Sequence, residues 1–143
     1  MGIEGLLPFL KPIMTSMHIS AFEGKTCAVD TMSWLYRGCY SCITDDMNSL
    51  KPKEYLNFIY KSILMLRRHG IKPIMVLDGR RLIAKAKTEE NRKKNKLLNR
   101  EKAKECLEKG DLNEAKKYLS RAIHISKEMI YYAIDLFRQL NVN

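Results

Sequence analysis

The sequence predicts an α/β protein built on a parallel sheet, with one βαβ unit and a projecting basic helical segment. Residues 25–30 and 73–79 form two short apolar runs that contain an aspartate near their ends, a pattern typical of buried strands. The amphipathic segment 53–69 lies between them, and a strand, a helix and a strand within about 50 residues favour parallel pairing. Residues 80–109 contain good helix formers but few apolar side chains, which predicts a helix that buries little surface.

The composition fits a soluble globular unit. The chain has 143 residues, of which 45% are hydrophobic and 29% charged, and these values exclude a disordered or collagen-like chain. No apolar run approaches the roughly 18 residues that a membrane span needs. The first residues lack the pattern of a secretory signal, and Leu6 stands where a myristoylation motif requires Ser or Thr. We therefore expect no membrane partner.

Local patterns predict the helices before and after the first strand. Residues 3–10 favour a short helix that ends near Pro12, and residues 31–42 favour a second helix. Residues 44–52 are polar and turn-like. Segment 53–69 repeats apolar residues at helical spacing, and Gly70 suits its C-terminal cap. The apolar positions of that helix are Leu56, Ile59, Tyr60, Ile63 and Leu66.

The last third of the chain predicts amphipathic helices over 111–140. Asp111 follows Gly110 and precedes Glu114 by three residues, which is a pattern similar to a capping box. No further strand is predicted. Because two strands alone make a poor sheet, the sequence favours the N-terminal portion of a larger domain.

The positive charge is concentrated in one segment. Lys plus Arg number 26 and Asp plus Glu number 16, which gives a net charge of +10. Between residues 80 and 104, eleven basic residues stand against three acidic ones, so this segment carries +8 of that total. A localised positive field indicates a polyanion partner, most often a nucleic-acid backbone. A solvated helix face is the alternative.

The cysteines do not predict a zinc site. Cys39 and Cys42 have zinc-knuckle spacing, but no second pair follows, and the three His residues are isolated. Buried or partly exposed thiols in a reducing compartment are the better interpretation.

Asp30 and Asp78 are the candidate metal ligands. Each lies at the carboxyl end of a predicted strand, and parallel strands bring these ends to the same edge of a sheet. Two carboxylates that lie close together repel unless a cation separates them, and Mg²⁺ suits such a site. Two such ions about 4 Å apart promote phosphodiester hydrolysis. The alternatives are a helix N-cap for Asp30 and a plain turn at Asp78 and Gly79.

The basic segment would hold a phosphate backbone against this edge. In a helix, Lys85 and Arg92 are seven residues apart and share a face, which Lys96 and Asn99 continue. Arg grips a phosphate with two hydrogen bonds, and Lys supplies a point charge. The alternative is a surface helix that only aids solubility.

Three segments of the sequence have a recognisable pattern. They are Met1-Gly-Ile-Glu-Gly-Leu-Leu, Ala28-Val-Asp30-Thr-Met-Ser-Trp-Leu-Tyr36 and Gly70-Ile-Lys-Pro-Ile-Met-Val-Leu-Asp78-Gly79, and Ser120-Arg-Ala-Ile-His-Ile-Ser126 continues the pattern. These segments resemble the N-terminal region of the XPG-type structure-specific 5′ nucleases. The branch that they resemble most is the eukaryotic 5′-to-3′ exonuclease of mismatch repair and end resection, followed by flap endonuclease.

The resemblance implies a role for each matching residue. Asp30 and Asp78 match two metal-binding aspartates of a PIN-like nuclease core. Lys85 and Arg92 match basic residues at the base of a helical arch that engage the scissile phosphate. Gly2 matches a glycine that lies near the DNA. The resemblance further implies an aromatic at Tyr36 that stacks on a base, and Arg37 in the wedge region. The basic segment itself adds Arg81, Lys93 and Lys96 as expected DNA contacts.

The resemblance also implies an activity. A Mg²⁺-dependent hydrolase of this type cleaves DNA at 5′ ends, nicks or flaps by two-metal catalysis, acts in DNA repair after DNA damage, and works in the nucleus. The family's later carboxylate ligands match nothing in residues 1–143, so the region 1–143 resembles the N-terminal part of such a nuclease, without its later catalytic half. The alternatives are a truncated, non-catalytic protein that binds DNA ends, and a fragment without function.

Overall fold

The computed structural model describes residues 3, 5–43, 53–79 and 83–142. The predicted DNA contacts Gly2 and Arg81 and the predicted turn at 44–52 lie outside these residues. The elements, in chain order, are α1 (Leu6–Leu10), η1 (Lys11–Ile13), η2 (Ile19–Phe22), β1 (Thr26–Asp30), α2 (Thr31–Ser41), α3 (Tyr55–Arg68), β2 (Lys72–Val76), η3 (Ile83–Lys85), α4 (Ala86–Glu108), α5 (Leu112–Arg121) and α6 (Lys127–Gln139).

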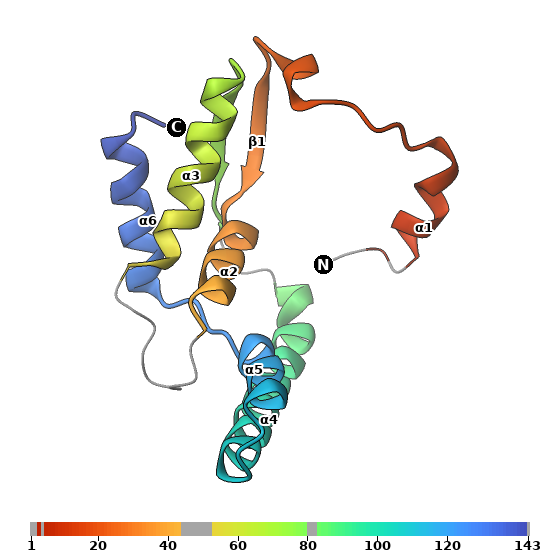
Figure 1. Ribbon diagram of the computed structural model, residues 1–143, viewed down its shortest axis with the longest axis vertical. Coiled ribbons are helices and arrows are strands. Elements are labelled where there is room, and N and C mark those ends of the chain that lie inside the picture. Colours follow the sequence, from red (N-terminus) through yellow and green to blue (C-terminus); the bar gives the residue numbers. More distant parts are fainter. Residues whose placement is uncertain (1–2, 4, 44–52, 80–82, 143) are drawn as a thin grey trace.

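The two strands form a small parallel sheet. Ala28 pairs with Ile74 and Asp30 pairs with Val76, while α2 and α3 make the connection between the strands (Figure 1). The predicted βαβ unit is therefore confirmed. The predicted strand 73–79 was too long, because β2 ends at Val76 and Asp78 lies two residues beyond it.

One face of this sheet is open, so the prediction of fully buried strands was wrong. Val29 and Met75 are buried, whereas Ile74 is 37% and Val76 is 49% exposed. The reason is that α3 and α6 lie on one side of the sheet, while α1 lies on the other side and leaves these side chains exposed (Figure 1). In the part of the chain that the structure describes, a single layer of helices covers the sheet.

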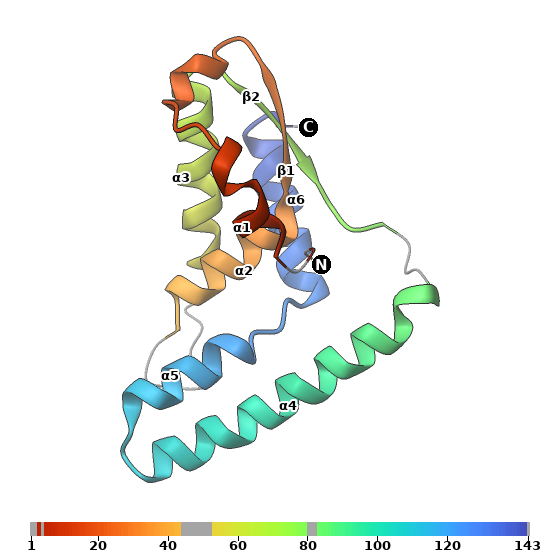
Figure 2. The same ribbon diagram turned by 90° about the vertical axis from the view of Figure 1, so that its right-hand side faces the viewer.

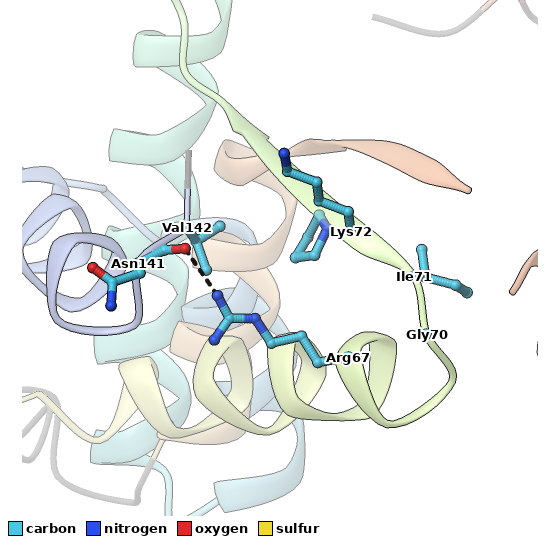
Figure 3. Close-up of a pocket in the computed structure, with 7 residues that line it drawn as sticks. Arg67, Gly70, Ile71, Lys72, Asn141 and Val142 are labelled. Atoms are coloured by element: carbon cyan, nitrogen blue, oxygen red, sulfur yellow. Dashed lines mark hydrogen bonds between the residues drawn. The ribbon is translucent and has the colours of Figure 1, made fainter. Parts of the chain in front are cut away.

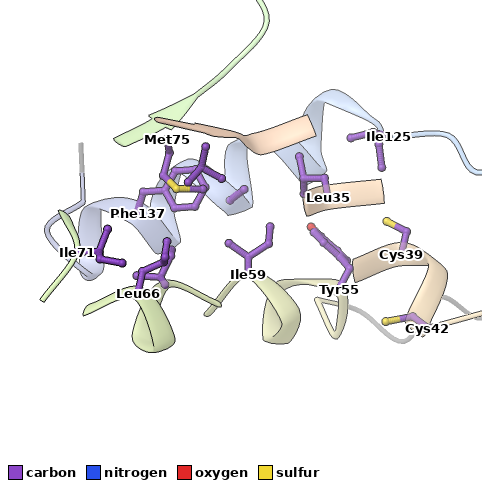
Figure 4. Packing of buried hydrophobic residues seen from close by; sticks show 13 residues of the cluster. Leu35, Cys39, Cys42, Tyr55, Ile59, Leu66, Ile71, Met75, Ile125 and Phe137 are labelled. Carbon is purple, nitrogen blue, oxygen red and sulfur yellow. The ribbon is translucent and has the colours of Figure 1, made fainter. Parts of the chain in front are cut away.

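The hydrophobic core lies between this covered face and the helices. Ile59 and Ile63 of α3 are fully buried, and Phe137 of α6 lies close to Met75 of β2 (Figure 4). The prediction for α3 was correct except at Tyr60, which is 41% exposed. The inward stripe instead runs through Tyr55, Ile59, Ile63 and Leu66, which are three or four residues apart, and Tyr60 lies at its flank.

The predicted helix end at Gly70 is confirmed. Gly70 has a φ of 68°, which favours glycine, and its N–H donates to the Arg67 carbonyl over 3.0 Å. The N–H of Ile71 donates to the Leu66 carbonyl, also over 3.0 Å. This pair of hydrogen bonds is the Schellman motif, and it turns the chain directly into β2.

The segment predicted as amphipathic over 111–140 forms two helices. Asp111 caps α5, since its Oδ1 accepts from the N–H of Glu114 over 3.1 Å. The capping-box pattern is only half used, because the Glu114 carboxylate pairs with Lys117 instead. Ser126 caps α6 through the N–H of Met129. Two separate caps explain why the chain breaks into two helices here.

Helices α4 and α5 form a hairpin that projects from the sheet and its helices (Figure 2). Ala103 is the one buried residue among the described residues of α4, and Ala115 of α5 is also buried. The predicted polar helix is thus confirmed over 86–108. Within the described ranges, no helix is both long enough and apolar enough to cross a membrane.

The cysteines are thiols of the kind that the sequence predicted. Cys39 and Cys42 are buried, and Cys27 and Cys106 are partly exposed. Burial raises the pKa of the Cys39 thiol to about 11, so this thiol is protonated and packs as an apolar side chain.

Candidate nucleic-acid and metal site

Asp30 ends β1 and at the same time caps α2. Its Oδ1 accepts a hydrogen bond from the Ser33 N–H over 3.2 Å, and its Oδ2 accepts one from the Ser33 hydroxyl over 2.6 Å. The helix-cap interpretation is therefore confirmed. The hydroxyl of Ser33 is the main cause that holds the pKa of Asp30 below its usual value. A carboxylate accepts about four hydrogen bonds or ligands, so this ionised group keeps capacity for a cation.

The cap gives Asp30 a measurable effect on stability. We expect Asp30→Ala to lower the free energy of unfolding by about 1 kcal/mol at neutral pH, and Asp30→Ser to lower it less, because serine also caps helices. The folded-state pKa of Asp30 lies below its ordinary value of 3.8. Its ionic contribution is therefore complete above that value and is lost as the pH falls through the folded-state pKa. Urea unfolding at pH 7 and pH 3 measures the free energy of unfolding of each variant. If Asp30→Ala lowers that free energy by the same amount at both pH values, this assignment is contradicted.

Asp78 lies at the same edge of the sheet as Asp30. It is exposed and follows β2 by two residues, and the strands run in the same direction. No group of three or more His, Cys, Asp or Glu side chains that could hold a metal occurs within the described residues. Two carboxylates with water ligands suit Mg²⁺, which keeps several waters in most protein sites. Asp30 and Asp78 thus fit part of a magnesium site but do not make a complete two-ion site.

The basic residues follow at the start of α4. Lys85 is the N-cap residue of α4 and is partly buried, while Arg92 and Lys93 are exposed about two turns later. The first turn of α4 follows β2 along the chain and lies beyond its carboxyl end (Figure 2). Lys85 ends the 3-10 turn η3, directly before the first residue of α4, so the structure places Lys85 and Arg92 at the same end of this helix. Whether these cations act together with Asp30 and Asp78 stays a prediction.

Two aromatic residues of α2 and α3 contact cations. The ammonium of Lys96 donates a hydrogen bond of 2.9 Å to the Tyr36 hydroxyl and lies 5.1 Å from the centre of its ring. The guanidinium of Arg37 lies 5.9 Å from the ring centre of Phe58. Tyr36 and Lys96 are thus brought together from α2 and α4, whereas Arg37 packs against α3. The sequence did not reveal the contact between Tyr36 and Lys96, which are 60 residues apart.

The structure adds a basic pocket that sequence reasoning missed. It has a volume of about 310 Å³ and lies between the end of α2 and α5. The signal that could have revealed it is the spacing of Lys117 and Arg121, which are four residues apart on α5. The lining residues are Tyr40, Ile43, Lys116, Lys117, Ser120 and Arg121.

A second pocket, of about 430 Å³, lies at the opposite edge of the sheet. There the Arg67 guanidinium donates to the Asn141 carbonyl oxygen over 2.9 Å (Figure 3). It also donates to the Leu140 carbonyl oxygen over 2.6 Å. Arg67 thereby joins the end of α3 to the residues after α6. This contact has a structural role, since it lies at the edge of the sheet opposite Asp30 and Asp78.

The sequence model of the XPG N-terminal domain family matches residues 1–99 of this chain. The match includes both candidate metal ligands and the first part of α4. The chain belongs to the XPG N-terminal domain family. The small parallel sheet with its helices is consistent with a part of such a domain.

Relatives with known names match along nearly the whole chain. Exonuclease 1 of Arabidopsis thaliana is 39% identical over 143 residues, which are all of this chain and 20% of the relative. Exonuclease 1 of Danio rerio is 35% identical over 143 residues, all of this chain and 18% of the relative. The DNA damage-inducible protein DIN7 of Saccharomyces cerevisiae is 35% identical over 135 residues, 94% of this chain and 31% of the relative. The chain thus spans between about a fifth and a third of the length of these relatives.

Proposed function

We propose that these residues belong to a Mg²⁺-dependent DNA nuclease that acts as a 5′-to-3′ exonuclease or 5′-flap endonuclease in nuclear DNA repair. The observation that supports the proposal is the parallel sheet: Asp30 ends β1, Asp78 follows β2 at the same edge, and the chain continues from there into the basic start of α4. The family match and the names of the relatives support it. The sheet is part of a PIN-like core, and α4 with α5 forms the helical arch.

The acidic and the basic residues of the site have different roles. When bound, Mg²⁺ supplies charge stabilisation and a more acidic water for phosphodiester hydrolysis. Asp30 and Asp78 hold the cation through their carboxylate oxygens. Lys85 and Arg92 bind the scissile phosphate and neutralise the charge that develops on it. Gly2 and Arg81 are proposed DNA contacts that lie outside the described residues.

The rest of α4 binds the phosphate backbone. Its exposed cations project from a helix that buries almost nothing, so they are free to approach a large anion. The basic pocket beside α5 extends this surface with Lys117 and Arg121. The substrates that this surface fits are DNA molecules with 5′ ends, nicks or flaps. Positive charge concentrated in one segment also favours fast, salt-sensitive association.

If α4 binds the phosphate backbone, the affinity for DNA depends measurably on the salt concentration. We expect the affinity of the full-length protein for a 5′-flap duplex to fall steeply with salt, and Arg92→Met with Lys93→Met to reduce the logarithmic slope by about 2. Fluorescence anisotropy between about 50 and 200 mM salt measures the slope. The control, Lys25→Met with Lys72→Met, removes the same charge from exposed sites at the opposite edge of the sheet. Equal slopes for the two double variants would exclude α4 as the DNA surface.

A second candidate is a non-catalytic protein that binds DNA ends. It is favoured by one observation, that the described residues contain no cluster of three or more metal-binding side chains. Both candidates predict the same salt dependence. They differ in hydrolysis, since a pure binder leaves DNA intact at every Mg²⁺ concentration.

A further inference from the structure

The middle of α4 is held to α2 by one polar contact. Among the cations of α4, Lys96 is partly buried, whereas Lys87, Arg92, Lys93, Lys94, Arg100, Lys102 and Lys104 are exposed. Its ammonium reaches the Tyr36 hydroxyl at 2.9 Å and lies 5.1 Å from the ring centre. The one buried residue of α4, Ala103, lies two turns further along the helix. The first half of α4 therefore has little apolar packing that could fix its position relative to α2.

This contact leaves both partners able to bind DNA. An ammonium has three N–H donors, and the bond to Tyr36 uses one of them. Tyr36 remains 37% exposed, so part of its ring is open to solvent. One nucleotide could therefore place its phosphate on Lys96 and its base on the Tyr36 ring. Stacking of a base on an aromatic ring depends on the ring being held in a defined orientation.

We propose that Lys96 is a positioning residue that fixes the Tyr36 ring as a stacking platform for an unpaired base of the DNA substrate. The hydrogen bond sets the position of the hydroxyl end, and the ammonium near the ring restricts its tilt. The contact also couples α4 to α2, so that binding of a phosphate on the arch and stacking of a base occur together. The inference rests on the proposed function, because it requires a DNA substrate.

The test uses full-length protein and a 5′-flap duplex with 2-aminopurine as its first unpaired nucleotide, in EDTA so that no hydrolysis occurs. Stacking quenches 2-aminopurine fluorescence, and anisotropy of a separate dye reports the affinity. We expect Lys96→Met to lose at least half of the quenching and to bind about tenfold more weakly than Lys104→Met. Lys104→Met removes the same charge from an exposed site on the same helix.

Two further variants separate positioning from charge and from folding. Lys96→Arg keeps a cation and a donor, and it should restore the quenching. Tyr36→Phe keeps the ring but removes the acceptor, and it should lose quenching in the same direction as Lys96→Met. The double variant Tyr36→Phe with Lys96→Met should bind no more weakly than Lys96→Met alone, because both changes remove one interaction. Thermal unfolding of all variants shows whether each one is folded.

The outcomes distinguish this inference from the proposed function. The inference is overturned if Lys96→Met quenches 2-aminopurine as strongly as the unmodified protein does and binds DNA as tightly as Lys104→Met. That result would leave the nuclease proposal intact. DNA binding by the unmodified protein without quenching would overturn the inference as well. An unmodified protein that does not bind the flap duplex would contradict the proposed function itself.

Discussion

Full-length protein that carries Asp78→Ala is expected to lose Mg²⁺-dependent DNA cleavage by about a thousandfold while it still binds DNA. Removal of a metal ligand forfeits several kcal/mol of transition-state stabilisation, and each 1.36 kcal/mol is a factor of ten in rate. Asp78 is the better target of the two aspartates. It is exposed and lies outside every described helix and strand, whereas Asp30 also caps α2.

The matched control is Asp135→Asn on α6. Asp135 is also an exposed acid, and its ion pair with Arg138 lies on the surface, where such pairs contribute little. Single-turnover cleavage of an end-labelled 5′-flap duplex at saturating protein separates the rate from the affinity. If Asp78→Ala cleaves DNA at the same rate as Asp135→Asn, Asp78 is not a metal ligand.

Gly38→Ala is expected to cause the largest loss of stability among small substitutions in α2. A Cβ at this position would lie 2.2 Å from the Tyr55 carbonyl oxygen and 3.1 Å from its carbonyl carbon, so α2 and α3 would have to separate. Overpacking of this kind costs about 3 kcal/mol, and the better helix propensity of alanine returns up to about 1 kcal/mol. The net loss is at least about 2 kcal/mol.

Thermal unfolding at neutral pH measures this effect. Gly79→Ala is the control, because no atom lies within 4 Å of a Cβ built there. We expect the control to unfold close to the unmodified protein and Gly38→Ala to unfold roughly 6–10 °C lower. A Gly38 variant as stable as the control would show that α2 and α3 do not approach as closely as the structure indicates.

Local features of the fold were predictable from the sequence. The Schellman end at Gly70, the start of α5 at Asp111 and the polar character of α4 each depend on residues within a few positions of one another. The parallel pairing of β1 and β2 followed from the order of strand, helix and strand. Asp30 was predicted both as a ligand and as a cap, and the cap is now visible.

Features that depend on contacts between distant residues were not predictable. An apolar run does not show whether one or both faces of a strand are covered, so the exposure of Ile74 and Val76 was missed. Tyr60 was misplaced because helical spacing alone does not show how far a buried stripe extends around the helix, and the packing of α3 leaves Tyr60 at its flank. The contact between Lys96 and Tyr36 joins residues from separate helices, and no spacing rule connects them. Gly2, expected from the resemblance, and Arg81, expected from the basic segment, stay predictions.

The proposed function requires that Asp30, Asp78 and the start of α4 form part of a metal-dependent nuclease site. The most direct test measures the products that full-length protein releases from a 5′-labelled flap duplex as MgCl₂ replaces EDTA. We expect no cleavage in EDTA and short 5′ products that increase with the Mg²⁺ concentration. Intact DNA at every Mg²⁺ concentration, under conditions where binding is saturated, would contradict the nuclease proposal and support the non-catalytic binder.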